Sequence, residues 1–165
     1  MPLADIMSHH VITVGLDDEL STLRKLFDAH GFHHVLVVDG QRLAGVISDR
    51  DVLREMSPFV DTLGERTQDV ATLRKKAHQF MSRKLVVARR DDSVAEAVAR
   101  MLDHSVSCLP VVTANGHVEG IVSWKDLIRA LAKSSGELPG GPSGEPPSRQ
   151  GAGGEPPSRQ GAKRE

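Results

Sequence analysis

The sequence predicts an α+β fold in which two β-α-β-β-α repeats pack as a pseudo-twofold pair. Three observations lead to this prediction. Met7-Ser8 returns as Met81-Ser82, 74 residues further along the chain. After one additional residue in the second copy, Gly45-Val46-Ile47-Ser48 returns as Gly120-Ile121-Val122-Ser123, at an offset of 75. Apolar positions also keep their class between the copies where identity is lost, so both copies should bury the same faces.

Each copy shows the same order of hydrophobic patterns. An extended segment (11–14 or 85–88) precedes a stretch with apolar residues at helical spacing, which Asp17 or Asp18, and Asp91 or Asp92, can cap. Two short apolar strands follow, joined by a turn at Asp39-Gly40 or Asn115-Gly116, and a second helix ends each copy (49–56 and 125–132). A unit of about 60 residues buries little surface alone, so the two copies should pack together.

These patterns divide the chain into four parts. We expect the first repeat over 1–60, a partly helical linker over 61–77, the second repeat over 78–133 and a tail over 134–165. The tail holds one nine-residue sequence twice, at 144–152 and 154–162, and is rich in Gly, Pro and Ser. Such a composition offers too little apolar surface to offset the entropy of ordering, so we expect the tail to be disordered.

Composition and charge exclude several classes of partner. The chain has 21 basic and 22 acidic residues, a formal net charge of −1, four Phe, one Trp and no Tyr. It therefore lacks the basic surface and the aromatic platform typical of nucleic-acid binding. A single cysteine permits no internal disulfide, and no apolar run approaches the ~20 residues that span a bilayer. The first residues show no signal-peptide pattern, and we expect a cytoplasmic protein without a nucleic-acid or membrane partner.

The last strand of each copy ends in a Gly-apolar-apolar-Ser-x-x-Asp motif. Ser48 and Asp51 form it in the first copy, and Ser123 and Asp126 form it in the second. A strand that runs into a helix start presents free N–H groups, and a carboxylate there can accept the hydroxyls of a ribose. The same spacing is also an ordinary helix cap, and a duplication would copy a cap equally well.

The ordered double set of motifs resembles tandem CBS domains, a family named after cystathionine β-synthase. The resemblance covers about 1–133 and includes the segment 33–39 and its partner 107–112. It implies a Bateman module, a disc-like pair that often forms homodimers and binds AMP, ADP, ATP or S-adenosylmethionine in its clefts. By position, it implies one site at Ile12, Thr13, His33, His34, Val46, Ser48 and Asp51, and another at Val86, Val87, Ser107, Cys108, Ile121, Ser123 and Asp126. A cleft in this family draws on both copies, so the segments 12–13 and 86–87 could each serve either site.

The two implied sites differ at the residues that face phosphate in the family. His33 and His34 occupy these positions in the first copy, whereas Ser107 and Cys108 occupy them in the second and supply no cation. We therefore expect the first site to prefer a phosphorylated ligand and to bind it more tightly below about pH 6.5, where an unperturbed histidine gains charge. Arg50 and Lys125 share one slot before the aspartate and could either reach phosphate or stay exposed.

Other readings of the sequence are less well supported. The eight histidines lack the cysteines and acidic residues of a zinc motif, so we expect no metal site and no required cofactor. The chain shows no P-loop, Gly-x-Ser-x-Gly or His-Glu-x-x-His motif, so we expect no catalysis. Cys108 enters an apolar strand, where a buried thiol is usually inert.

The sequence thus favours a non-catalytic sensor whose ligand changes its shape or its contacts. Without an attached effector domain, its output would pass to an unidentified effector protein or through self-association. The alternative is a structural module with empty clefts, whose main role is dimerisation.

Overall fold

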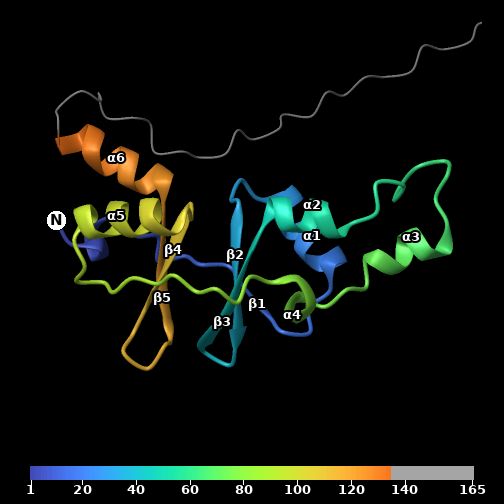
Figure 1. Cartoon of the computed structure of the whole chain (residues 1–165), viewed down its shortest axis with the longest axis horizontal. Helices are drawn as coiled ribbons and strands as arrows, with labels where there is room; N and C mark the ends of the chain where they lie inside the picture. Colours follow the sequence, from blue (N-terminus) through green and yellow to red (C-terminus); the bar gives the residue numbers. More distant parts are fainter. Residues whose placement is uncertain (135–165) are drawn as a thin grey trace, which may run out of the picture.

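Two units lie side by side in the computed structural model, which describes residues 1–134 (Figure 1). In the first unit, β1 (Thr13–Gly15) runs parallel to β2 (His34–Asp39), and β2 pairs antiparallel with β3 (Arg42–Ser48). Helix α1 (Leu20–Ala29) connects β1 to β2, and α2 (Asp49–Glu55) follows β3. This order matches the predicted β-α-β-β-α repeat.

The second unit repeats this arrangement with a weaker first strand. Helix α5 (Val94–His104) precedes the antiparallel pair β4 (Cys108–Val112) and β5 (Val118–Ser123), and α6 (Trp124–Ser134) follows. The expected strand at 85–88 is reduced to one parallel bridge, between Ala88 and Val111, where the first unit has the β1–β2 pairing. The α+β fold of two related repeats is confirmed.

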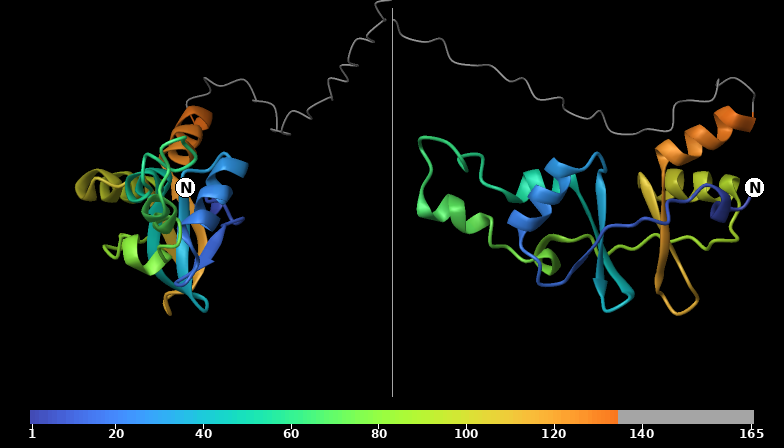
Figure 2. Two further views of the ribbon diagram at one scale, coloured as in Figure 1. Left: turned by 90° about the vertical axis from the view of Figure 1, so that its right-hand side faces the viewer. Right: turned by 180° about the vertical axis from the view of Figure 1, so that it is seen from behind.

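Three short helices lie outside the repeated elements. They are η1 (Leu3–Asp5), α3 (Thr67–Thr72) and α4 (Ala77–Phe80); α3 lies within the segment 61–77 that we expected to be a linker, and α4 begins at its last residue. An arm that contains α3 projects from the far end of the first unit (Figures 1 and 2). Helix α6 includes Ser134, the first residue of the predicted tail, and the rest of that tail lies outside the described residues.

Local chemistry explains the turns and helix starts. Gly40 and Gly116 adopt φ of 61° and 81° in the hairpin turns, a conformation that glycine tolerates at little cost. The prediction that the paired aspartates cap the first helix of each repeat was wrong. Asp18 Oδ2 instead accepts a hydrogen bond from the Gly15 amide at 2.7 Å, and Asp92 Oδ2 accepts one from the Arg89 amide at 2.9 Å. These aspartates close the turn before the helix, because a short carboxylate readily bonds a nearby amide.

The first residues of each repeat, its leading segment, pack in the hydrophobic core of the other unit. Leu3 and Met7 are buried in the core of the second unit, beneath α5, β4 and β5, although they belong to the start of the first repeat in sequence. Ala77 and Met81, which lead into the second repeat, are buried in the core of the first unit. Figures 1 and 2 show the N-terminus beside α5 and the chain after η1 crossing to β1, while the chain after α4 crosses back. Each unit is therefore completed by the other repeat's first residues.

Backbone hydrogen bonds also join the leading segment of each repeat to the sheet of the other unit. Ser8 pairs with Ile121 on β5, and Ser82 pairs with Val46 on β3, each as an antiparallel bridge. The turn sides of the two sheets also meet, where the Leu43 amide donates to the Gly116 carbonyl at 3.0 Å. These contacts hold the two sheets in a fixed relation and define the space between them.

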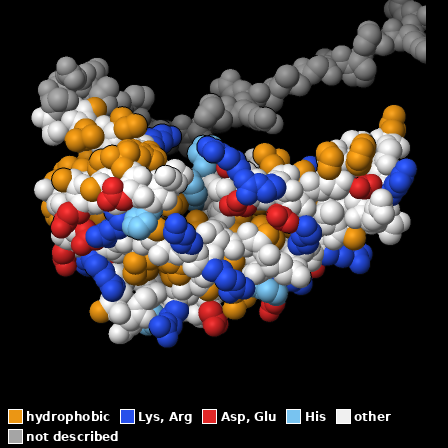
Figure 3. Space-filling view, in the orientation of Figure 1, with side chains coloured by type: hydrophobic (Ala, Val, Ile, Leu, Met, Phe, Trp, Pro, Cys, Tyr) orange, Lys and Arg blue, Asp and Glu red, His pale blue; other side chains and the backbone are white. Residues whose placement is uncertain are grey.

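Several large apolar side chains remain on the surface. Leu102 on α5 and Ile128 on α6 are 62% and 60% exposed, and hydrophobic side chains gather over these two helices (Figure 3). Leu53, Phe59 and Leu63 are exposed on α2 and in the arm. None of the helices in residues 1–134 combines the length and the apolar composition needed to cross a membrane.

Candidate ligand-binding site

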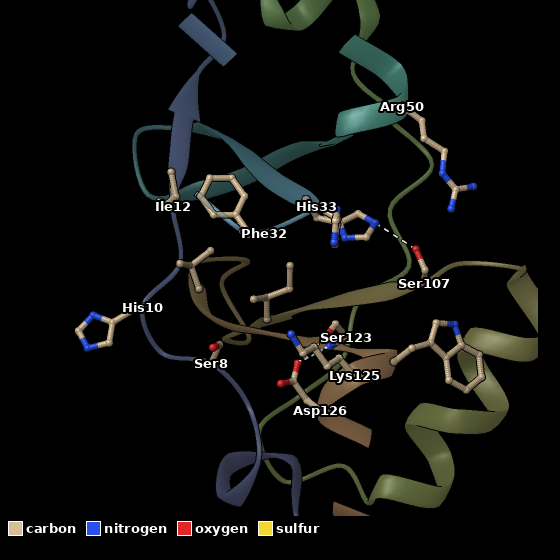
Figure 4. A pocket seen from close by; sticks show the side chains of 15 residues that line it. Ser8, His10, Ile12, Phe32, His33, Arg50, Ser107, Ser123, Lys125 and Asp126 are labelled. Atoms are coloured by element: carbon tan, nitrogen blue, oxygen red, sulfur yellow. Dashed lines mark hydrogen bonds between the residues drawn. The ribbon is translucent and has the colours of Figure 1, made fainter. Parts of the chain in front are cut away.

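A cavity of about 410 Å³ lies between the two units and draws its walls from both (Figure 4). This volume falls within the range of small-molecule sites, about 300–1,000 Å³. The cavity is formed by the crossing N-terminal segment, the residues leading into β2 and β4, and the β5–α6 junction. Its lining residues are Ser8, His10, Val11, Ile12, Gly31, Phe32, His33, His34, Arg50, Ser107, Ile121, Ser123, Trp124, Lys125 and Asp126.

The β5–α6 junction supplies a carboxylate to this cavity. Asp126 Oδ2 accepts hydrogen bonds from the Ser123 amide at 2.9 Å and from Ser123 Oγ at 2.6 Å. Within residues 1–134, its other oxygen, Oδ1, has one charged neighbour, Arg129 Nη1 at 3.8 Å. The Ser-x-x-Asp motif therefore does form a helix cap, which is the structural alternative that the sequence left open. Because one carboxylate oxygen is not used by the cap, Asp126 can still accept a hydroxyl group of a ligand.

Two histidines lie where the units meet at the cavity wall. His34 Nε2 and Ser107 Oγ share a hydrogen bond of 3.0 Å that joins the two repeats, and His33 Nδ1 lies 2.8 Å from Asp49 Oδ2. Burial lowers the pKa of His34, with smaller opposing effects of nearby charges. The charge gain that we expected of His34 near pH 6.5 is therefore displaced to lower pH in the ligand-free protein.

A second cavity, of about 320 Å³, adjoins the first on the side of β3 and α2. His33, His34, Ser48, Asp49, Arg50 and Ser107 line it. Ser48 and Asp51 form the same cap as their counterparts, with the Ser48 amide and Oγ donating to Asp51 Oδ2 at 2.8 and 2.7 Å. Of these two predicted site residues, the second cavity exposes Ser48 alone within residues 1–134.

The structure regroups the predicted site residues. Ile12, assigned by position to the first site, lies in the same cavity as Ser123 and Asp126 of the second. His33 and His34 also face this cavity, so the carboxylate opposite them is Asp126 and not Asp51. The regrouping follows from the crossing of the N-terminal segment, which places its residues beside the second repeat.

The remaining predicted residues lie away from both cavities. Thr13 lines a separate hollow near the hairpin turns, together with Gln41 and His117. Val46 pairs with Ser82, and Val86 packs against the core of the second unit. The Val87 carbonyl accepts a hydrogen bond from Arg100 Nη1 at 2.7 Å. Cys108 is buried, as expected of a residue that enters an apolar strand, and this burial raises the pKa of its thiol to about 12.

Several lining residues were not predicted from the sequence. Ser8, His10, Val11, Gly31 and Phe32 reach the cavity because the N-terminal segment crosses between the units and the chain turns into β2 beside it. In Figure 4, Ile12 and Phe32 lie on one side of the cavity, opposite Ser123 and Asp126, whereas His10 points away. The sequence offered one indication for Phe32, which directly precedes the predicted site residue His33.

The chemistry of the cavity suits binding. Within residues 1–134, no three His, Cys, Asp or Glu side chains converge as a metal site would require. The cavity instead combines apolar side chains (Ile12, Phe32, Ile121), a carboxylate and basic side chains. Such a lining fits a ligand with an apolar ring, hydroxyl groups and a charged end.

The chain belongs to the CBS domain family. The family model matches residues 3–58 and 77–133, which are the two repeats. A CBS domain-containing protein of Dictyostelium discoideum is 32% identical over 130 residues, which are 78% of this chain and 89% of that protein. Protein MJ1404 of Methanocaldococcus jannaschii is 31% identical over 136 residues, 81% of this chain, but the match spans only 28% of the length of MJ1404.

Solved CBS domain pairs share the fold. The pair of protein MJ0100, in complex with 5′-methylthioadenosine and S-adenosyl-L-methionine, has a TM-score of 0.67 and 24% identity, covering 81% of this chain and 98% of its own. CBSX2 in complex with AMP has a TM-score of 0.68 and 23% identity, covering 81% of this chain and 98% of its own. At this identity the likeness shows the architecture, a pair of CBS repeats.

Proposed function

We propose that this CBS pair is a non-catalytic regulatory module that binds an adenine nucleotide or a related adenosyl compound in the 410 Å³ cavity. The observation that supports this most strongly is the composite lining. Ile12 of the crossing segment faces the cavity together with Asp126 of the other repeat. A ligand held by both repeats has a different affinity for any arrangement that separates them, and this difference is what a sensor requires.

The chemistry of the lining supports an adenosyl ligand. The apolar side chains can enclose a purine, and the unused oxygen of Asp126 can accept a ribose hydroxyl. The printed ligands of the two structural neighbours, 5′-methylthioadenosine with S-adenosyl-L-methionine and AMP, share the adenosine part. Asp51 does not line either of the two cavities, so Asp126, and not Asp51, is the carboxylate proposed to bind the ribose.

The output of the module would pass to an effector protein or to a second copy of the chain in the cytoplasm. Leu102 and Ile128 offer an apolar face on α5 and α6 that a homodimer would bury. The competing proposal is a module that dimerises without any ligand. Light scattering of the wild type and of a Leu102→Glu, Ile128→Glu variant tests the dimer, which the double substitution should dissociate.

Thermal unfolding in the presence of AMP, ADP, ATP, 5′-methylthioadenosine and S-adenosylmethionine tests the ligand. A compound at 100 times its Kd adds about 2.7 kcal/mol to the free energy of unfolding. Asp126→Asn should remove this shift, whereas Asp51→Asn should keep it. The two variants are matched, because each changes the acidic residue of a Ser-x-x-Asp cap with the same hydrogen bonds. If no compound raises the melting temperature, the ligand-free module is the better description.

A further inference from the structure

The arm that projects from the first unit, formed by residues 57–72, carries apolar side chains on its surface (Figures 1 and 2). Phe59 is 56% exposed, Val70 is 37% exposed and Leu63 is fully exposed. Large apolar side chains gathered on one exposed segment mark a contact with another protein, because binding removes their surface from water. The arm is therefore a candidate interaction surface.

Hydrogen bonds hold the arm in a defined conformation. At its base, Ser57 Oγ donates to Asp69 Oδ1 at 2.6 Å, and further along, Arg24 Nη2 on α1 donates to Asp61 Oδ2 at 2.7 Å. Asp61 has a φ of 62°, which costs energy for a residue with a side chain, and its amide donates to Glu65 Oε2 at 2.7 Å. A segment that is ordered before binding loses less conformational entropy when it docks. The arm is thus suited to present its apolar side chains to a partner.

The α5–α6 face of the second unit, with Leu102 and Ile128 exposed, complements the arm in polarity and in charge. Helix α6 has three basic residues and one acidic residue, whereas the arm has three acidic residues and one basic residue. Net charges of opposite sign attract the arm to α6, and like charges disfavour a contact between two arms or between two α6 helices. The surface chemistry therefore favours one pairing, arm on α5–α6 face.

The placement of the two surfaces requires a second copy of the chain for this pairing. The arm lies at one end of the molecule and α5 and α6 lie at the other, both away from the hairpin turns (Figures 1 and 2). The two surfaces therefore cannot meet within one chain. A twofold axis that sets two copies antiparallel brings each arm to the α5–α6 face of the other copy, which gives two identical contacts in a closed dimer.

We infer that the arm docks on the α5–α6 face of a second copy of the chain, so that two antiparallel copies cover each other's Leu102 and Ile128. This inference rests on the homodimer of the proposed function and adds the segment that makes the contact and the relative direction of the two copies. The apolar side chains of the arm, Phe59 and Leu63 above all, lose their exposed surface in this contact.

Cross-linking of cysteine variants of the full chain tests the direction of the two copies. The native Cys108 is buried and its pKa is raised to about 12, so it should not react. A flexible bismaleimide should join Leu63→Cys to Ile128→Cys in an equimolar mixture and give little product with either variant alone. Gln41→Cys, exposed in the β2–β3 hairpin turn, is the control and should not be joined to Ile128→Cys.

Sedimentation equilibrium tests the contribution of the arm to the dimer. Phe59→Ser with Leu63→Ser should raise the Kd of the dimer roughly tenfold or more, because two large apolar side chains leave the contact. Leu85→Ser, at an exposed leucine outside the arm, should leave the Kd unchanged. Cross-linking of Leu63→Cys to itself, or an arm variant as dimeric as the wild type, would overturn the inference while the proposed homodimer stands. A wild type that is monomeric at all concentrations would overturn both and would leave the arm to a different protein.

Discussion

Met7 packs against Gly120 across the boundary between the two repeats. A Cβ atom on residue 120 would lie 3.0 Å from Met7 Sδ and 2.9 Å from the carbonyl oxygen of Ser8. Met81 meets Gly45 in the same way in the other unit, where a Cβ would collide with the methionine side chain. In each unit, then, the missing side chain of a strand glycine makes room for the leading segment of the other repeat.

Substitution of these two glycines by alanine should destabilise the packing of the leading segments to different extents. Gly120→Ala should lower the free energy of unfolding by about 1–3 kcal/mol, because the backbone of Ser8 has to move. Gly45→Ala should cost less, since the three atoms nearest to the added methyl group belong to the side chain of Met81 and not to the backbone. Denaturant unfolding measures both values. Gly31→Ala is the control, because no atom lies within 4 Å of the position of its Cβ. A Gly45 variant less stable than the Gly120 variant would contradict this explanation.

Shortening of Leu3 should loosen the second unit although Leu3 belongs to the first repeat in sequence. Leu3 is fully buried in the core of the second unit, and such Leu→Ala changes cost about 2–5 kcal/mol. Amide hydrogen exchange should show a greater loss of protection in β4 and β5 than in β2 and β3. Leu20→Ala, equally buried in the first core, should give the opposite pattern. A greater loss of amide protection in β2 and β3 for the Leu3 variant would refute the packing of Leu3 in the second unit.

Protonation of His34 should destabilise the ligand-free protein in acid. Burial lowers its pKa below the unfolded value of 6.5, so its contribution to stability is complete above pH 6.5 and is lost as pH falls through the folded value. Asp49 and Asp51 oppose this effect of burial, while His33 and Arg50 add to it. His34→Gln should therefore flatten the pH dependence of the free energy of unfolding between about pH 5 and 6.5. The exposed His9→Gln serves as the control, and equal slopes for the two variants would count against the assignment.

Cys108 should react with thiol reagents only after the second unit opens. Its side chain is 6% exposed and burial raises its pKa to about 12, so little thiolate is present or accessible at pH 8. Labelling by an aromatic disulfide at pH 8 should be slow in buffer and fast in guanidinium chloride. Above the unfolded value of 9.0, stability should fall with rising pH, because the unfolded thiol ionises first. Rapid stoichiometric labelling of the native protein would disprove the buried placement.

The sequence by itself determined the repeated elements of this protein. The match of Met7-Ser8 to Met81-Ser82 and of Ser48 to Ser123 predicted two copies of one unit, and local hydrophobic spacing located α1, β2, β3 and their counterparts. Both signals arise from neighbouring residues along the chain, so they can be read without a structure. The capping role expected of Asp18 and Asp92 failed even at this level, because a nearby amide in the preceding turn competed for each carboxylate.

Only the tertiary structure decided which repeat each site residue serves. Ile12 and Asp126 belong to different repeats, and they share a cavity because the start of the first repeat pairs with β5 before the chain crosses to β1. Two equivalent repeats leave open whether each leading segment packs on its own unit or on the other, since both choices bury the same apolar faces. In the structure Met7 packs on Gly120 and Met81 on Gly45, so the leading segments are crossed, and the composite cavity is the consequence.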